Sequence, residues 1–354
     1  MRRMGHIHGP QPSPTAQVLH WPVFITYLAC WAGAVGLLLW GRKAGVNWAL
    51  PAGILFVVGA FTSLVSLARR LPVQNVVACG LVILALAAVV TTLGAKTGLP
   101  GHFDGYTERM GPRLLGLMPW SVPFLWFVIL YNSRDAAKLI LRPWRRDKQY
   151  GLWLVGLGAL LTVAMDFILE PFAVNVEKWW SWRLPIPTAE QSNLPWSGYL
   201  NWSGVPWTSF VGWFVYGGLT LLFVGPWLAR RRPLHQQTDF HAVVLWVSLG
   251  LLFAVGNAQA QLWKPALFGA AVSLLVAGSA WRNGRRIALG LALPPGAPPP
   301  PPSAAPPPGP PSPPGAPGPP APSSPLGQPA PSGPLGQPAP PKAPPEAPGP
   351  KPPG

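Results

Sequence analysis

Charged side chains are scarce in this sequence. Lys, Arg, Asp and Glu make up 10% of the 354 residues, and only ten of them are acidic. A soluble domain carries roughly 25% charged residues. Hydrophobic residues supply 49% here, and several apolar runs approach the roughly 20 residues that a helix needs to cross a bilayer. The composition predicts a protein that is embedded in a membrane.

Motifs for metal, nucleotide and redox chemistry are also missing. The six histidines show no HxxxH or HxxHH grouping, which membrane di-iron enzymes need because each iron takes several imidazoles. There is no GxGxxG, no Gly-rich phosphate loop and no DxxxD pair for a Mg²⁺-diphosphate. Cys30 and Cys79 stand alone in apolar runs, where packing is their expected role. We therefore expect neither a cofactor nor a resident metal.

The net charge of +16 does not indicate a nucleic-acid partner. The basic residues form short clusters between the apolar runs, as topology signals do in membrane proteins. The polar N-terminus leads into an apolar run that ends in charge without a small-residue cleavage site, which indicates a retained span.

The apolar runs predict an all-α fold, a polytopic membrane bundle of about eight transmembrane helices. Pro119 and Pro123 lie in the fourth run, which is acceptable where neighbouring helices satisfy the freed carbonyl groups. The spans are predicted near residues 20–40, 48–68, 73–95, 114–132, 151–170, 208–228, 240–257 and 262–281.

The basic residues also predict the orientation. With a cytoplasmic N-terminus, 16 Lys and Arg residues fall on the inside and eight on the outside. This bias and the even number of spans place both termini in the cytoplasm. We expect a multi-pass protein of the cell (inner) membrane.

The composition changes near the C-terminus. From Pro294 onward the chain holds 31 of its 50 prolines and a near-repeat, PLGQPAP, at 325–331 and 334–340. This segment cannot bury enough apolar surface to fold, so it is predicted to be disordered, as an SH3-type docking tail or a dispensable extension. The expected regions are a disordered cytoplasmic N-terminus at 1–18, a transmembrane domain at 19–290 and the proline-rich tail at 291–354.

Two carboxyl groups stand at the end of the fifth apolar run, in MDFILEPF. Asp166 and Glu170 are four residues apart and so share one helix face. An ionisable residue inside a membrane is a functional-site hypothesis by default. The alternative is that both simply end the helix at the interface beside Pro171, but the helix dipole disfavours an acid there.

Tryptophan is concentrated in the same region, where seven of the 19 lie between residues 179 and 213. An interfacial belt is one explanation. However, the loop that carries them is long, punctuated by proline and almost uncharged, so we expect an ordered cap over the bundle. A pocket of acids and indole faces can protonate an apolar molecule and stabilise the resulting cation.

These blocks resemble a known family. DFILEPFAVNVEKWWSW and SGYLNWSGVPWTSFVGWF are similar to the D-x-x-x-(D/E)-P, W-x-W and G-V-P-x-x-N-F-x-G-W elements of carotenoid hydratases of the bisanhydrobacterioruberin hydratase and γ-carotene 1'-hydroxylase type. YTERMGPRLLGLMPWSVPFLWF is similar to the family block from Y-T-(D/E)-x-x-G-P to P-x-x-W. The resemblance covers roughly residues 80–280. Ser209, in place of Asn, and PGHFDG before Tyr106 depart from the pattern, which leaves the substrate end group open.

The resemblance implies hydration of the terminal C1,2 double bond of an acyclic carotenoid ψ end to a tertiary alcohol, without a cofactor. The motif match selects positions, and for their roles we expect Asp166 to be the general acid, Glu170 or Glu108 to deprotonate or position the water, and Tyr106 to orient an acid. Membrane-dissolved carotenoid and other enzymes of carotenoid synthesis are the implied partners. The implied substrate-binding residues are Trp180, Trp182, Trp202, Trp207, Ser209, Phe210 and Trp213.

Two other functions fit parts of the sequence. A transporter of a lipidic or small organic solute would use the same acids as proton-relay groups, and it predicts inverted repeats with broken helices. A non-catalytic scaffold would depend on the proline-rich tail, so that deletion of residues 294–354 would abolish its function.

Overall fold

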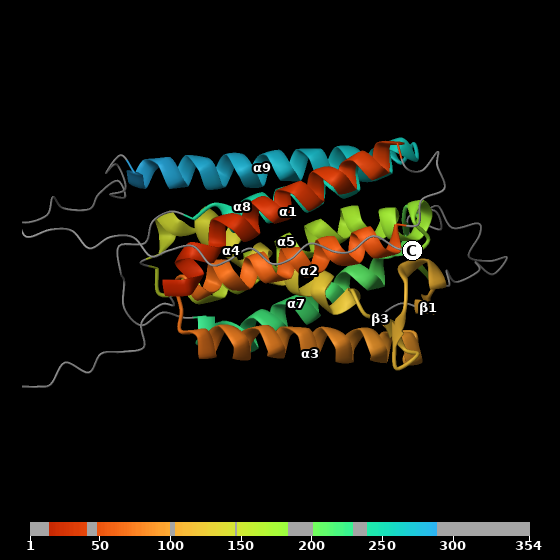
Figure 1. The fold of residues 1–354 in the computed structure, drawn as a ribbon, viewed down its shortest axis with the longest axis horizontal. Coiled ribbons are helices and arrows are strands. Elements are labelled where there is room, and N and C mark those ends of the chain that lie inside the picture. The colour runs from red at the N-terminus through yellow and green to blue at the C-terminus, as the bar shows by residue number, and fades with distance from the viewer. Residues whose placement is uncertain are drawn as a thin grey trace, which may run out of the picture. The chain divides into compact units, whose positions relative to one another are not determined.

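The structure, a computed structural model, describes residues 14–40, 48–99, 103–145, 147–182, 201–228 and 239–288. Eight long α-helices account for most of these residues (Figure 1). Among them, all but α4 are long and apolar enough to cross a membrane, which confirms the predicted polytopic all-α fold. The bounds are α1 Pro14–Trp40, α2 Ala49–Ala68, α3 Val73–Thr97, α4 Val122–Ile140, α5 Tyr150–Pro171, α7 Trp207–Leu228, α8 His241–Gln259 and α9 Trp263–Ala288.

The fourth helix lies further along the chain than the sequence predicted. The expected span was 114–132, but α4 begins at Val122 and ends at Ile140. Pro123 falls in its first turn, where a backbone N–H would have no acceptor within the helix, so the missing N–H of proline costs no hydrogen bond. The polar residues Asn132 and Asp135 continue the helix because α4 is buried between α2, α3, α5 and α8 rather than exposed to lipid. A hydropathy pattern detects helices that face lipid, and α4 faces other helices instead, so the pattern placed this helix too early in the chain.

The other seven helices overlap the expected spans. The first begins at Pro14, inside the segment assigned to the N-terminal region, and α9 extends to Ala288. The proline-rich tail and most of residues 1–18 lie outside the described residues. A short 3₁₀ turn, η3 (Arg142–Trp144), joins α4 to α5.

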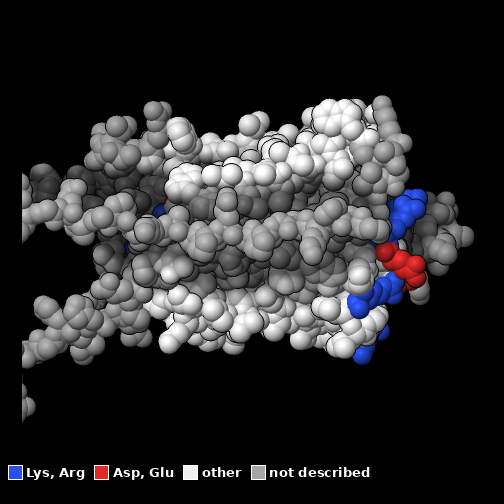
Figure 2. Space-filling model, in the orientation of Figure 1, with Lys and Arg blue, Asp and Glu red and all other residues white. Residues whose placement is uncertain are grey.

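The flanks of the bundle suit a lipid environment. In the view of Figure 2 the described charged side chains gather toward the ends, and the described surface between them is uncharged. Large apolar side chains on α3 and α7, among them Leu81, Val89, Leu219 and Phe223, are more than half exposed. Such exposure is costly in water but neutral in hydrocarbon, where lipid tails cover these residues.

Short strands cover the end of the bundle at which α3 and α5 finish and α4 and α7 begin (Figure 1). In the largest pairing, β1 (Phe103–Tyr106) runs antiparallel to β4 (Trp180–Trp182). This ladder joins two loops that are more than 70 residues apart in sequence. The other elements here are η2 Glu108–Met110, β2 Arg113–Leu114 paired with β3 Met118–Pro119, and β5 Asn201–Trp202 paired with β6 Val205–Pro206.

The β5–β6 hairpin turns through two residues, Ser203 and Gly204, that both have positive φ. This is the backbone of a type I′ turn, which matches the twist of paired strands. The side chain of Asn175 donates to the Ser203 carbonyl at 2.8 Å and so ties the hairpin to the segment after α5. The predicted cap is therefore ordered at both ends, while residues 183–200, with Trp196, lie outside the described residues.

Candidate active site

The last turn of α5 is shaped by Pro171. Proline has no N–H, so the carbonyl of Phe167 loses its helical partner. The indole N–H of Trp202 donates to that carbonyl at 2.9 Å. The chain then continues into a π-helical turn, η4 (Phe172–Val176), and the Asn257 side chain donates to the carbonyl of Ile168 at 2.8 Å. Side chains from other elements thus complete the turn that carries both acids.

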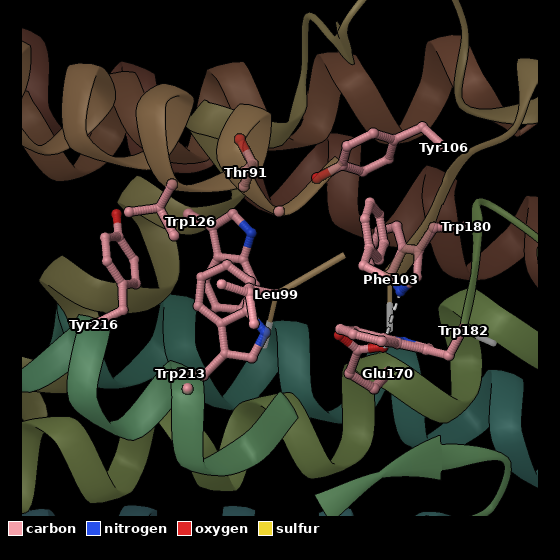
Figure 3. Close-up of a pocket in the computed structure, with 13 residues that line it drawn as sticks. Thr91, Leu99, Phe103, Tyr106, Trp126, Glu170, Trp180, Trp182, Trp213 and Tyr216 are labelled. Atoms are coloured by element: carbon pink, nitrogen blue, oxygen red, sulfur yellow. Dashed lines mark hydrogen bonds between the residues drawn. The ribbon is translucent and has the colours of Figure 1, made fainter. Parts of the chain in front are cut away.

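Glu170 is held by two indoles. The Nε1–H groups of Trp180 and Trp182 both donate to its Oε2, each at 2.8 Å (Figure 3). The two tryptophans alternate along β4, so their side chains project to the same face. The carboxyl is only 1% exposed. Neutral N–H donors orient this group without supplying the positive charge of an arginine or lysine.

Asp166 lies one helical turn before Glu170. Its side chain is fully buried, and neither oxygen has a hydrogen-bond partner among the described residues. The two carboxyls are close enough to interact electrostatically. Within the described part of the chain, the ion pairs involve other carboxylates and neither of these two. The pair is therefore buried without a cation.

A cavity of about 60 Å³ lies against Glu170. Figure 3 shows the Tyr106 hydroxyl pointing into it toward Thr91. Burial, and then the nearby Glu170, raise the pKa of Tyr106, so this group is a neutral hydrogen-bond donor at any working pH. The volume accommodates water, since one molecule needs roughly 10–15 Å³. The lining residues are Val90, Thr91, Gly94, Leu99, Phe103, Tyr106, Trp126, Glu170, Trp180, Trp182, Gly212, Trp213 and Tyr216.

Aromatic rings surround most of the cavity. The rings of Trp126 on α4 and Trp213 on α7 stack with centroids 3.4 Å apart and an interplanar angle of 19°. The Trp213 indole N–H and the Tyr216 hydroxyl are buried, and the first interacts with Glu170 and the second with Thr220. Both residues line an otherwise aromatic space.

The residues nominated from the sequence fall into two groups. Tyr106, Glu170, Trp180, Trp182 and Trp213 come together around the cavity. The others do not line it. Phe210 stacks on the ring of Phe167 in α5, and the Trp202 indole N–H donates to the backbone carbonyl of Phe167. Trp207 is 43% exposed.

Three polar nominees also lie away from the cavity lining. Glu108 is exposed in η2, and the structure does not bring it to the buried pair. Ser209 is fully buried at the start of α7, and its hydroxyl has no partner in the described residues. Asp166 is buried but does not line the cavity.

Sequence reasoning missed eight of the 13 lining residues, namely Val90, Thr91, Gly94, Leu99, Phe103, Trp126, Gly212 and Tyr216. A signal existed for Trp126, because it is the tryptophan that closes the P-x-x-W end of the block beginning at Tyr106. Thr91 and Tyr216 lie within apolar helices, where no pattern distinguishes a cavity wall from packing.

The fold and the site define a multi-pass membrane protein with a buried carboxyl pair beside an indole-lined cavity. The chain belongs to the carotenoid biosynthesis protein family, whose model matches residues 52–276. It is similar to bisanhydrobacterioruberin hydratase of Haloarcula japonica, with 28% identity over 217 residues. That alignment covers 58% of this chain and 64% of the relative, so the chain spans less than two thirds of that protein's length. No solved structure matches the chain.

Proposed function

We propose that this protein adds water to the terminal C1,2 double bond of an acyclic carotenoid end group and forms a tertiary alcohol. The observation that carries the proposal is Glu170, a buried carboxyl fixed by two indole N–H groups on the wall of an aromatic cavity. Membership of the carotenoid biosynthesis family and the hydratase named among its relatives support the substrate class.

The reaction is an acid–base addition. A carboxylic acid donates a proton to C2, and the C1–C2 π electrons form the new C–H bond and leave a tertiary cation at C1. Water then bonds to C1 through its oxygen, and the resulting oxonium returns a proton to the carboxylate. The sum is one alkene and one water giving one alcohol, with no change in oxidation state, so the chemistry requires no cofactor.

Glu170 is the group that reaches the reacting carbons in this proposal. It lines the cavity, and Asp166 does not. Asp166 acts as a positioning residue: two carboxyls buried one turn apart without a cation resist carrying two negative charges, so in this proposal they share one proton. That proton is the one delivered to C2. This assignment differs from the expectation drawn from the sequence, in which Asp166 was the general acid and Glu170 or Glu108 acted on the water.

The aromatic walls serve the cation. An indole face attracts positive charge, and the effect is strongest where water is excluded. Trp126, Trp182 and Trp213 surround the space beside Glu170. The hydroxyl of Tyr106, opposite the acid, holds the attacking water.

We also propose the orientation in which both termini are cytoplasmic and the cavity lies near the outer face of the cell membrane. The two-to-one excess of basic residues on the inner segments supports it. Cysteine substitution at exposed Glu108 and at exposed Trp144, followed by labelling of intact cells with an impermeant maleimide, tests the orientation. Labelling is expected at Glu108→Cys and absent at Trp144→Cys; the reverse pattern would overturn it.

The test of activity is expression in cells that accumulate lycopene, followed by mass spectrometry of the pigments. We expect a product heavier by one water, about 18 Da. Glu170→Gln is expected to lower its yield at least 100-fold, as loss of a general acid typically does. Glu108→Gln is the matched variant: it is exposed, so its yield should stay within twofold of the wild type. Unchanged pigments with the wild-type protein in the membrane would refute the function.

A further inference from the structure

A long groove runs between α3 and α7 on the flank of the bundle. Its volume is about 1600 Å³, and nearly all of its lining is apolar. Leu93 on α3 and Val215 and Leu219 on α7 are each more than half exposed along it, so the groove is open to the bilayer. Its lining on α3 runs from Leu86 to Thr97, and its lining on α7 runs from Trp207 to Trp227.

The groove is continuous with the cavity at Glu170. Five residues line both spaces: Val90, Gly94, Leu99, Gly212 and Tyr216. Two of them, Gly94 on α3 and Gly212 on α7, are glycines, and the backbone carbonyl of Leu99 lies close against Gly94. A molecule lying in the groove can therefore place one end beside the acid.

The length of the groove matches the membrane. Its lining extends along α7 from Trp207 to Trp227, a rise of about 30 Å at 1.5 Å per residue. The hydrocarbon core of a bilayer is also about 30 Å thick. A tryptophan stands at each end of this stretch, and the space between them suits a long hydrocarbon that lies along the membrane normal.

We propose, on the basis of the proposed hydration, that the groove binds the polyene chain of the substrate lengthwise, with one end at Glu170 and sideways entry from the bilayer. A phospholipid fits less well at the end of the groove next to Glu170. The two carboxyls there have no cation, so a phosphate headgroup would meet negative charge without a partner. A stiff polyene also loses little conformational entropy on binding.

This arrangement has a kinetic consequence. A molecule held along the groove presents one end to the acid while its other end lies near the opposite surface of the bilayer. Hydration of the second end of a symmetric substrate therefore requires release, reversal and rebinding. The singly hydrated product should accumulate before the doubly hydrated one.

Retention of polyene by purified protein tests the groove separately from catalysis. The probe is lycopene offered to protein in phosphatidylcholine nanodiscs, in the Glu170→Gln background, with bound polyene measured by visible absorption. Val90→Trp fills the junction, and its neighbour Val89→Trp is the control because Val89 is 54% exposed and lines neither space. We expect Val90→Trp to lower retention at least fivefold and Val89→Trp to leave it unchanged.

A second variant guards against misfolding at the junction. Leu219→Trp lies in the groove wall on α7, outside the cavity at Glu170, and should also lower retention. Equal retention by all three variants, or no retention above empty nanodiscs, would overturn the groove proposal. If polyene is retained but the wild type never hydrates it, the proposed function fails and the groove stands.

The time course of the wild type with lycopene is the second readout. If the singly hydrated pigment appears transiently and is found in the membrane lipid, no longer bound to the protein, lengthwise binding is supported. Doubly hydrated product formed without this intermediate would contradict it.

Discussion

Two sets of buried carboxyl groups lie at opposite ends of the bundle, and only one set is neutralised by arginine. Asp135, in the last turns of α4, and Asp239, just before α8, share Arg70 at 3.0 and 2.6 Å. Arg134 contacts Asp135 at 2.8 Å and Arg69 contacts Asp239 at 3.1 Å. These carboxylates tie α2, α4 and α8 together.

We call the end with Asp135 and Asp239 the ionic end, and its arginines keep the carboxylates charged. Burial alone would raise the pKa of Asp239, but its hydrogen bond with His241 and the charge of Arg70 outweigh burial and hold that pKa well below its usual range. A group that stays ionised cannot give or take protons near neutral pH. The ionic end is therefore suited to stability.

The pair at the other end has the opposite character. Asp166 and Glu170 are as deeply buried, yet their described partners are two indole N–H groups on one of them and none on the other. Indole donors fix direction and leave the charge uncompensated. The contrast teaches that burial of an acid does not identify a functional site; the absence of a cation beside it is the more telling feature.

The two sets of carboxyl groups should differ most in how much they contribute to the stability of the fold. Asp135→Asn leaves Arg70 and Arg134 facing a neutral amide, and breaking a buried ion pair costs roughly 3–5 kcal/mol. Asp166→Asn removes a group that has no partner, so we expect a change within about 1 kcal/mol, together with loss of hydration. Thermal unfolding of both variants in nanodiscs measures this. Equal destabilisation by the two substitutions would remove the distinction.

The next largest effect should come from removing the hydrogen bonds that Trp180 and Trp182 donate to Glu170. Trp180→Phe or Trp182→Phe keeps an aromatic ring and deletes one N–H bond to Glu170, worth roughly 0.5–1.5 kcal/mol for a neutral acceptor. We expect hydration to fall by roughly threefold to tenfold with little loss of protein. Trp202→Phe is the matched control, because its indole bonds a backbone carbonyl and its loss should lower stability instead. Similar activity in all three variants would contradict this assignment.

Acid pH gives the smallest effect. The folded-state pKa of Asp239 lies below the unfolded-state value of about 3.9. The stability it contributes is therefore complete above about pH 4 and is lost as pH falls below that value, because the unfolded chain binds the proton first. Asp239→Asn should flatten the fall in unfolding temperature between about pH 4 and 3. A slope identical to the wild type would show that this carboxylate is not held by Arg70.

Much of this was predictable because lipid imposes simple rules on sequence. The spacing of Asp166 and Glu170 placed them on one face, and the hydropathy runs located seven helices. The fourth was misplaced because a helix buried inside the bundle, with Asn132 and Asp135, lacks the apolar signal. The difference between Asp166 and Glu170 also escaped, since it depends on the β1–β4 ladder that brings Trp180 and Trp182 over only one of them.

The proline at the end of α5 bears on the order in which the protein is made. The carbonyl of Phe167 has no α-helical donor at Pro171, and the indole N–H that bonds it belongs to Trp202, which is translated 35 residues later. The turn that carries Glu170 therefore gains this hydrogen bond only after the strand β5 has been made.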